Sequence, residues 1–394
     1  MPVLKLTVIC FLWLLGVALI WPILPFQALG LGATPLVVGL LFATDTAVAM
    51  VAAPLFGRLS DRLGRRPMII AGLVIGAGGY VILAFATSLP ELFLSRILGG
   101  LSLASIPALQ AALADCTSRE RRIDGFSSFH GAHAIAFVVG PLTTWQALEV
   151  FEVAPTAIAL LAGATVLAAI FFLSPAEESS SASAADGEGE VATAEAGWRD
   201  FMAPAFIIPV AVVTLLGVSQ SGWDAILAVW SEAKLSWDEG NVAIAYAVAG
   251  SCAAFSQFFI VPKIAARRGE VSVAILAGSA CAVGLAILAV SQGGPMTFLA
   301  LGLFGTAIAT ANSCLFARLT QVVADDRQGT ALGLADSFLS MAWLVGPLLA
   351  GLAFESLTAL PFLLGAALAA LATGVLALWP QATPDQGAAV VQER

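Results

Sequence analysis

Charged residues are scarce in this sequence. Only 11% of its 394 residues are Asp, Glu, Lys or Arg, whereas 59% are hydrophobic, and the mean hydropathy is +0.95. A soluble globular chain carries about 25% charged residues, so this chain lacks the polar surface to face water on all sides. Its main solvent is therefore lipid. The net charge of −9 comes largely from loops and tails and says little about partners, although we expect no nucleic acid among them.

Catalytic and metal-binding motifs are also missing. The five cysteines are scattered, mostly inside apolar runs, and show neither metal-ligand spacing nor a disulfide framework. The sequence has no Gly-x-x-x-x-Gly-Lys-Ser/Thr phosphate loop, so ATP could drive this protein only through another subunit. No hydrolase or transferase constellation is present. We therefore expect no enzyme, no cofactor and no metal.

Long apolar runs are what the sequence does have. A helix needs about 20 apolar residues to cross a bilayer, and these runs are continuously apolar, which favours helices over an alternating strand barrel. We predict an all-α membrane protein with twelve transmembrane helices, of which the first is retained rather than cleaved as a signal peptide. The predicted spans are residues 6–26, 36–56, 68–87, 92–113, 126–148, 154–173, 203–230, 242–262, 271–291, 296–317, 331–354 and 357–379.

The basic residues predict the orientation of these spans. Nearly all of those between the spans fall on one side of the predicted membrane, and the opposite loops carry only Lys234. Because Lys and Arg are enriched in cytoplasmic loops, we expect both termini to be cytoplasmic, in a bacterial-type inner membrane. The basic residues on the cytoplasmic side are Lys5, Arg58, Arg62, Arg65, Arg66, Arg119, Arg121, Arg122, Arg199, Lys263, Arg267, Arg268, Arg318, Arg327 and Arg394.

The chain divides into two halves with internal similarity. Residues 174–200, rich in Ser, Ala, Gly and Glu, predict a flexible cytoplasmic linker between bundles at 1–173 and 201–380, and residues 381–394 form a tail. Val-Gly-Pro-Leu occurs at 139–142 and again at 345–348, and the charged stretch 57–67 has a weaker counterpart at 263–270. Paired six-span halves with a site between them are typical of secondary transporters.

One loop carries a resemblance to a known family. Residues 57–66 read Gly-Arg-Leu-Ser-Asp-Arg-Leu-Gly-Arg-Arg, which resembles the signature loop of the major facilitator superfamily at the same topological position. Arg-Ile-Leu-Gly-Gly at 96–100 and Gly-Pro at 140–141 resemble its fourth- and fifth-span motifs. The stretches 21–25 and 112–118 look most like the tetracycline-type drug/proton antiporters. The resemblance implies two pseudo-symmetric six-helix bundles, alternating access, and a monomer that exchanges a small molecule for protons.

The sequence also departs from that family. Tetracycline antiporters carry aspartates in their first, third and ninth spans, where this chain has Trp13, Gly79 and Cys281, and the fifth-span motif continues with Leu-Thr-Thr in place of a Gly-Gly pair. The resemblance therefore supports the fold better than the substrate or the proton site.

The signature loop implies a gate. Its glycines permit a tight turn and close helix approach, and Asp61 is expected to latch the halves together on the cytoplasmic side, against the start of the eleventh span near Asp336. The alternative is that the arginines only hold topology and bind anionic lipid headgroups. The candidate gating residues are Gly57, Arg58, Asp61, Arg62, Gly64, Arg65 and Arg66.

Two ionisable residues within spans are candidates for proton coupling. Asp45 lies near the middle of the second span, where an unpartnered carboxylate is costly and desolvation favours its neutral form. The alternative is a structural hydrogen bond to Thr44 or Thr46. A charge such as Arg96 inside a span usually marks a pathway or a partner, unless it snorkels to the near interface.

Three further titratable residues join this group. His130 and His133, the only histidines, share one face of the fifth span, and imidazole titrates near neutral pH. Counting from the Gly-Pro pairs places His130 and Asp336 at equivalent repeat positions. In this fold the fifth span faces the eighth and the eleventh faces the second. We expect a proton path or polar cavity; ordinary interhelical hydrogen bonding is the alternative, and a metal site is the weaker one.

The seventh span mixes polar and aromatic residues, as a cavity lining does. Gly222 would let it bend, and Asp224, toward the outer side, would attract a cationic substrate or serve an outer gate, whereas Trp230 and Trp237 read as membrane-interface anchors. The candidate cavity residues are Gln110, Gln220, Trp223, Asp224, Tyr246, Gln257 and Asn312. We predict proton-coupled export of a lipophilic small molecule. The alternatives are a metabolite or lipid carrier, which includes a passive facilitator, and a non-transporting receptor.

Overall fold

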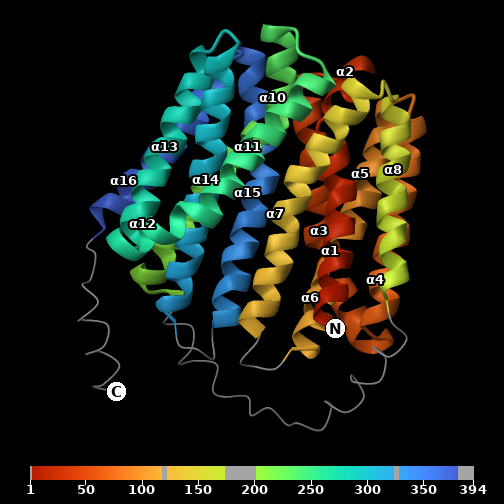
Figure 1. Ribbon diagram of the computed structural model, residues 1–394, viewed down its shortest axis with the longest axis horizontal. Helices are drawn as coiled ribbons and strands as arrows, with labels where there is room; N and C mark the ends of the chain where they lie inside the picture. Colours follow the sequence, from red (N-terminus) through yellow and green to blue (C-terminus); the bar gives the residue numbers. More distant parts are fainter. Residues whose placement is uncertain (1, 118–121, 174–200, 324–327, 380–394) are drawn as a thin grey trace.

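The computed structural model describes residues 2–117, 122–173, 201–323 and 328–379, and within these ranges it contains helices and no strands. Most of the helices run up and down in the view of Figure 1, and α1 begins at the lower edge of the bundle. We call that edge the proximal end and the opposite edge the distal end. The first half denotes the helices up to residue 173, and the second half those from residue 201.

The first half contains two spans that are broken. Each break precedes a short helix with proline in its first turn, where the missing N–H and the ring interrupt the helical hydrogen bonds. One break lies at residues 21–23 and the other at 104–105. The helices are α1 (Pro2–Ile20), α2 (Leu24–Gly30), α3 (Pro35–Leu63), α4 (Arg65–Phe85), α5 (Leu89–Leu103), α6 (Ile106–Asp115), α7 (Arg122–Trp145), the π-helix η2 (Gln146–Val150), α8 (Pro155–Ala168) and the 3₁₀ helix η3 (Ala169–Phe172).

The second half has longer unbroken helices. They are α10 (Pro204–Leu235), α11 (Glu239–Phe259), α12 (Val261–Arg268), α13 (Glu270–Val290), α14 (Pro295–Gln321), α15 (Gln328–Ser356) and α16 (Leu360–Leu378). Counted over both halves, the described residues contain eleven helical segments that are long and apolar enough to cross a membrane. The helix α7 lies where the fifth of the twelve spans is predicted, although it is not among these eleven segments. The prediction of an all-α integral membrane protein is confirmed.

The packing of the first half is repeated in the second. In the first half α1 packs on α7 and α8, α4 packs on α5 and α8, and α3 packs on α5. In the second half α10 packs on α15 and α16, α13 packs on α14 and α16, and α11 packs on α14. Each of these contacts in the first half thus has an equivalent in the second half, which supports the proposed division into two bundles. The proposed linker lies outside the described residues.

The signature loop and its weak counterpart share one backbone turn. Gly64 and Gly269 have φ of 93° and 78°, in a region that side chains disfavour, and each starts a helix of 21 residues, α4 and α13. The tight turn that the loop glycines predict is confirmed at Gly64.

The two Gly-Pro pairs let helices approach closely. A Cβ atom placed on Gly140 would lie 2.5 Å from the Cβ of Ala18 in α1, and one placed on Gly346 would lie 2.1 Å from the Oγ of Ser221 in α10. Neither position has room for a side chain. The glycines therefore set the distance between α7 and α1, and between α15 and α10.

The largest contacts between the halves are those of α7 with α11 and of α3 with α15, the two pairs that were predicted, and α10 also packs on α2 and α3. The α3–α15 contact is tight at the distal end, where a Cβ on Gly39 would lie 2.3 Å from the carbonyl oxygen of Pro347 and one on Gly351 would meet the first turn of α3. Toward the proximal ends, a Cβ on Gly57 of α3 or Gly333 of α15 would meet nothing within 4 Å. The contact between α3 and α15 is therefore tight at the distal end, and no close contact of this kind exists at Gly57 or Gly333.

We expect Gly64→Ala and Gly269→Ala each to destabilise the protein by about 1–3 kcal/mol, because the alanine Cβ strains a backbone conformation that only glycine adopts freely. The measurement is the midpoint of thermal unfolding in detergent. Gly78→Ala is the control, since Gly78 is helical and has open space around its missing Cβ. Equal midpoints for all three variants would contradict the role of the turn.

Candidate functional site

An ion pair lies inside the first half, nearer its distal end. The Nη1 of Arg96 in α5 donates to the Oδ2 of Asp45 in α3 at 3.0 Å, and the two side chains are only 7% and 13% exposed. The Nη2 of Arg96 also donates to the Oγ of Ser95 at 3.4 Å. The partner of Asp45 is therefore an arginine on another helix. Arg96 does not snorkel, and Thr44 donates instead to the carbonyl of Leu40.

The glycines after Arg96 make this pair possible. A Cβ on Gly100 would lie 2.5 Å from the carbonyl oxygen of Asp45, so α5 reaches α3 only because position 100 has no side chain. The pair is also incomplete, because Asp45 Oδ1 and Arg96 Nε are buried and form no hydrogen bond within the described structure. A buried pair with one free acceptor and one free donor can rearrange when either group changes its partner.

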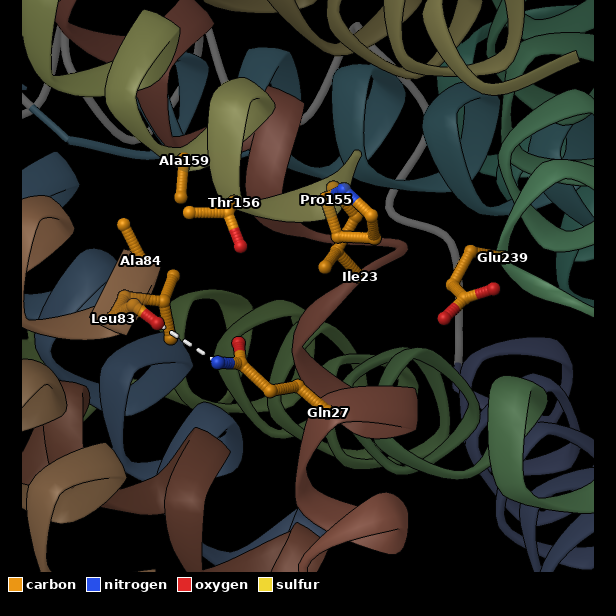
Figure 2. Close-up of a pocket in the computed structure, with 8 residues that line it drawn as sticks. All are labelled: Ile23, Gln27, Leu83, Ala84, Pro155, Thr156, Ala159 and Glu239. Carbon is orange, nitrogen blue, oxygen red and sulfur yellow. Dashed lines mark hydrogen bonds between the residues drawn. The ribbon is translucent and has the colours of Figure 1, made fainter. Parts of the chain in front are cut away.

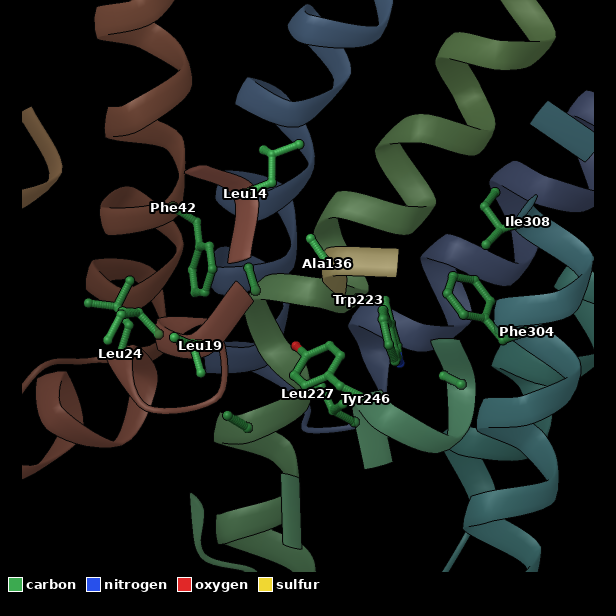
Figure 3. Packing of buried hydrophobic residues seen from close by; sticks show 14 of the residues in the cluster. Leu14, Leu19, Leu24, Phe42, Ala136, Trp223, Leu227, Tyr246, Phe304 and Ile308 are labelled. Atoms are coloured by element: carbon green, nitrogen blue, oxygen red, sulfur yellow. The ribbon is translucent and has the colours of Figure 1, made fainter. Parts of the chain in front are cut away.

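A second buried acidic residue lies in the second half, next to Trp223 in the chain. Asp224 in α10 is 7% exposed, and no ion pair involves it among the described residues. Its backbone carbonyl accepts a hydrogen bond from the Oη of Tyr246 at 2.8 Å. The ring of Trp223 lies 5.3 Å from that of Tyr246 and 4.9 Å from that of Phe304 (Figure 3). Three predicted cavity residues are thus brought together, with Phe304 as an addition.

A further aromatic cluster joins the two halves. Trp21, at the break between α1 and α2, lies 5.0 Å from Phe42, 5.7 Å from Phe137 and 6.1 Å from Trp343, each measured between ring centroids. Trp343 belongs to α15, so this cluster crosses from one half to the other. These four residues were not among the predicted site residues. The signal that could have found them is the tryptophan beside Pro22 in an otherwise apolar span.

The predicted polar residues separate into two contacts. The Nδ2 of Asn312 in α14 approaches the Oε1 of Gln220 in α10 at 3.5 Å, which joins two predicted cavity residues. Gln257 instead accepts a hydrogen bond at 3.1 Å from Ser313, on the neighbouring helix. Gln110 lies half-buried on α6 in the first half, apart from that group. The amides therefore do not form a single cluster.

The signature loop is tied to its own half. Asp61 pairs with Arg65 at 2.5 Å, and Arg65 also reaches Ser60 at 3.2 Å and Asp115, at the end of α6, at 3.5 Å. The side chain of Asp61 is 66% exposed. Of the remaining gating candidates, Gly57 borders open space, Arg58 and Arg62 are exposed, and Arg66 is half-buried. The contact of Asp61 with the start of α15 stays a prediction for a different conformation.

The other titratable candidates lie along the proximal parts of α7 and α15. His133 is exposed and stacks on Phe137, with ring centroids 5.1 Å apart, and Asp336 is exposed. The side chain of His130 lies outside the described residues. Among the described residues no group of three or more His, Cys, Asp or Glu side chains could hold a metal ion.

One expectation for the seventh span is wrong. Trp230 is 0% exposed, packs on Phe362 at 5.1 Å and has Lys234 over its ring, so it is a core residue and no interface anchor. The helix α10 is continuous through Gly222, and a Cβ on Gly222 would lie 3.2 Å from the carbonyl oxygen of Gly346; the bend at Gly222 stays a prediction.

A bundle of membrane-spanning helices with buried charges, and with the same packing in both halves, defines a membrane transporter rather than an enzyme. The model of the Major Facilitator Superfamily matches residues 6–347. The chain belongs to that superfamily.

Curated relatives cover nearly the whole chain. Quinolone resistance protein NorA of Staphylococcus aureus (strain MRSA252) is 25% identical over 351 residues, which are 88% of each chain. Multidrug resistance protein 2 of Bacillus subtilis (strain 168) is 25% identical over 390 residues, which are 96% of this chain and 95% of the relative. The resemblance to transporters of the drug-efflux type is thereby confirmed.

Solved structures show the same fold. The nucleoside transporter NupG has a TM-score of 0.75 at 14% identity and covers 97% of this chain and 100% of its own. The human organic anion transporter MFSD10 has a TM-score of 0.62 at 21% identity and covers 95% of this chain and 98% of its own.

We expect Asp45→Asn and Arg96→Gln each to lower stability by about 3–5 kcal/mol, because each leaves one buried charge without its partner. The double variant Asp45→Asn/Arg96→Gln places two neutral amides at the same positions, so its loss should be smaller than the sum of the two single losses. The measurement is the free energy of unfolding in mixed detergent micelles. Additive losses would show that the pair does not act as a unit.

Proposed function

We propose that this transporter exports lipophilic, cationic small molecules in exchange for protons. The observation that carries the proposal is the buried Asp224, which follows Trp223 in α10 and whose backbone carbonyl accepts a hydrogen bond from Tyr246. Relatives named for quinolone and multidrug resistance support a drug-like cargo. The proposed setting is a cytoplasmic membrane, with the proximal end and both termini in the cytoplasm and the protein acting as a monomer.

The proposed cargo site combines charge and aromatic surface. A buried carboxylate without a cation among its described neighbours attracts a positive charge, and aromatic faces bind cations and flat apolar groups. The cluster around Trp21 extends the aromatic surface into the first half. Gln220 and Asn312 supply hydrogen bonds to the polar groups of the cargo, and Gln110 and Gln257 do so from the cavity margins.

The proposed proton carrier is the pair of Asp45 and Arg96. Protonation of Asp45 would neutralise its ion pair with Arg96. The Nε of Arg96, which forms no hydrogen bond in the described structure, would then be available to another acceptor. His130, His133 and Asp336 are the proposed titratable groups on the cytoplasmic approach to this pair. His133 and Asp336 are exposed, as groups that exchange protons with water must be.

The proposed cycle is alternating access, and the described conformation fits its inward-facing state. The halves pack tightly at the distal end, whereas space surrounds Gly57 and Gly333 at the proximal end. In this state Asp61 forms an ion pair with Arg65 of its own half and does not hold the signature loop to the start of α15. In the outward-facing state Asp61 moves to the start of α15, and Gly57 then permits the close approach. The outer arginines Arg58, Arg62 and Arg66 bind anionic lipid headgroups or support that latch.

The coupling can be tested with ethidium, whose permanent charge prevents it from following a pH gradient by itself. In proteoliposomes with a lumen more acidic than the bath, the wild type should accumulate ethidium by exchange with luminal protons. In Asp45→Asn the accumulation should fall to the level of empty liposomes. Glu355→Gln, an exposed site at the end of α15, is the control. Wild-type uptake that ignores the gradient would sink the coupling claim.

The cargo site predicts a charge-dependent affinity. We expect Asp224→Asn to weaken the binding of tetraphenylphosphonium about five- to thirtyfold, because one buried charge–cation contact contributes about 1–2 kcal/mol. Titration calorimetry of the purified protein measures this Kd, again with Glu355→Gln as the control. An unchanged Kd in Asp224→Asn would remove this carboxylate from the cargo site.

A further inference from the structure

A glutamate of the first half rests on a helix end of the second half. Glu149 lies in the π-helix η2, which ends α7 at the distal side. A Cβ placed on Gly240 of α11 would lie 2.0 Å from the Oε1 of Glu149, 2.7 Å from its Cδ and 2.9 Å from its Cγ. The glutamate side chain therefore occupies the space that any larger residue at position 240 would need.

Gly240 belongs to the first turn of α11, where backbone N–H groups lack helical partners. Asp238 caps this end and accepts a hydrogen bond from the N–H of Asn241 at 2.9 Å. The partial positive charge of a helix N-terminus attracts a carboxylate. Glu149 supplies one from across the boundary between the halves.

A pocket on the same face confirms that the start of α11 is seated on the first half. The pocket measures about 190 Å³, and all of its lining residues belong to the first half except Glu239 (Figure 2). Its wall is held by a hydrogen bond at 2.8 Å from Gln27 in α2 to the carbonyl of Leu83 in α4. Two consecutive residues of α11, Glu239 and Gly240, thus lie against the other half.

We propose that Glu149 is a positioning residue for the transport cycle, a latch that holds the distal end closed by resting on Gly240 at the start of α11. Asp238 and Glu239 already place two carboxylates at this helix end, and their repulsion offsets part of the attraction for a third. The latch is therefore weak enough to open in every cycle. This role rests on the proposed alternating access, and it is independent of the cargo and of the coupling ion.

The π-helix gives the latch its position. A π-helix inserts an extra residue per turn and turns the following side chains about the axis. The η2 segment follows α7 directly, so this insertion aims residues 146–150 differently from a continued α-helix. The glutamate is thereby directed at α11, the helix on which α7 already packs.

The test is a distance measurement that needs no transport. Spin labels are attached at Ala154→Cys and Leu357→Cys, two exposed distal loop positions of opposite halves, in a cysteine-free full-length protein reconstituted in nanodiscs. Pulsed electron resonance then gives the fractions of short and long distances, which correspond to closed and open distal ends. We expect Glu149→Ala and Gly240→Ala each to raise the long-distance fraction about two- to fivefold. Glu152→Gln, an exposed neighbour, is the matched control and should change nothing.

A second comparison separates the latch from general damage to packing. In a Glu149→Ala background the methyl group of Gly240→Ala fits the space that the glutamate has left, so the second substitution should add no further opening. Thermal unfolding of each variant verifies that it is folded. An unchanged distribution in Glu149→Ala, or an equal effect of Gly240→Ala in both backgrounds, would overturn the latch. Failure of the ethidium or tetraphenylphosphonium experiments would leave these distances untouched, so the two hypotheses fail separately.

Discussion

Helices that meet in lipid gain little from the hydrophobic effect, because the lipid they leave is as apolar as the partner they find. Their association depends on close backbone contact, and here residues without side chains provide it. Gly140 and Gly346 set the packing inside each half, and Gly39 brings the halves together at the distal end. Gly100 brings α5 near enough to α3 for Arg96 to reach Asp45. The electrostatics of the protein thus depend on where its glycines are.

Much of the fold follows from the sequence because its signals are periodic or repeated. Runs of about 20 apolar residues predict the spans, and the repeated Gly-Pro pairs predict two similar halves. Both glycines lie at close helix contacts in the structure, on α1 and on α10. The pairing of α3 with α15 follows from the family resemblance. Helix interiors are less predictable. The sequence near a span end does not show whether a tryptophan faces lipid or a neighbouring helix. For this reason the prediction for Trp230 was wrong.

The site was only partly predictable, since its contacts are between helices distant in sequence. Trp223, Asp224 and Tyr246 were recognised by type and meet in the structure. That Asp45 and Arg96 are partners could not be read from either span alone, because 51 positions separate them. Trp21 and Trp343 escaped notice because an aromatic residue in an apolar span is ordinary; only their meeting across the halves gives them a role.

The two halves share one packing arrangement and differ in the continuity of their first spans. The first span is cut into α1 and α2 at residues 21–23, whereas its counterpart α10 is a single rod of 32 residues, about 48 Å long. Nearly every residue of α10 between 216 and 231 is buried, so neighbours hold the rod on all sides. We therefore expect the central part of α10 to move together with the helices packed around it. In the first half we expect the break beside Trp21 to let α1 and α2 change their relative angle, so a change of conformation would bend the first span there and leave α10 straight.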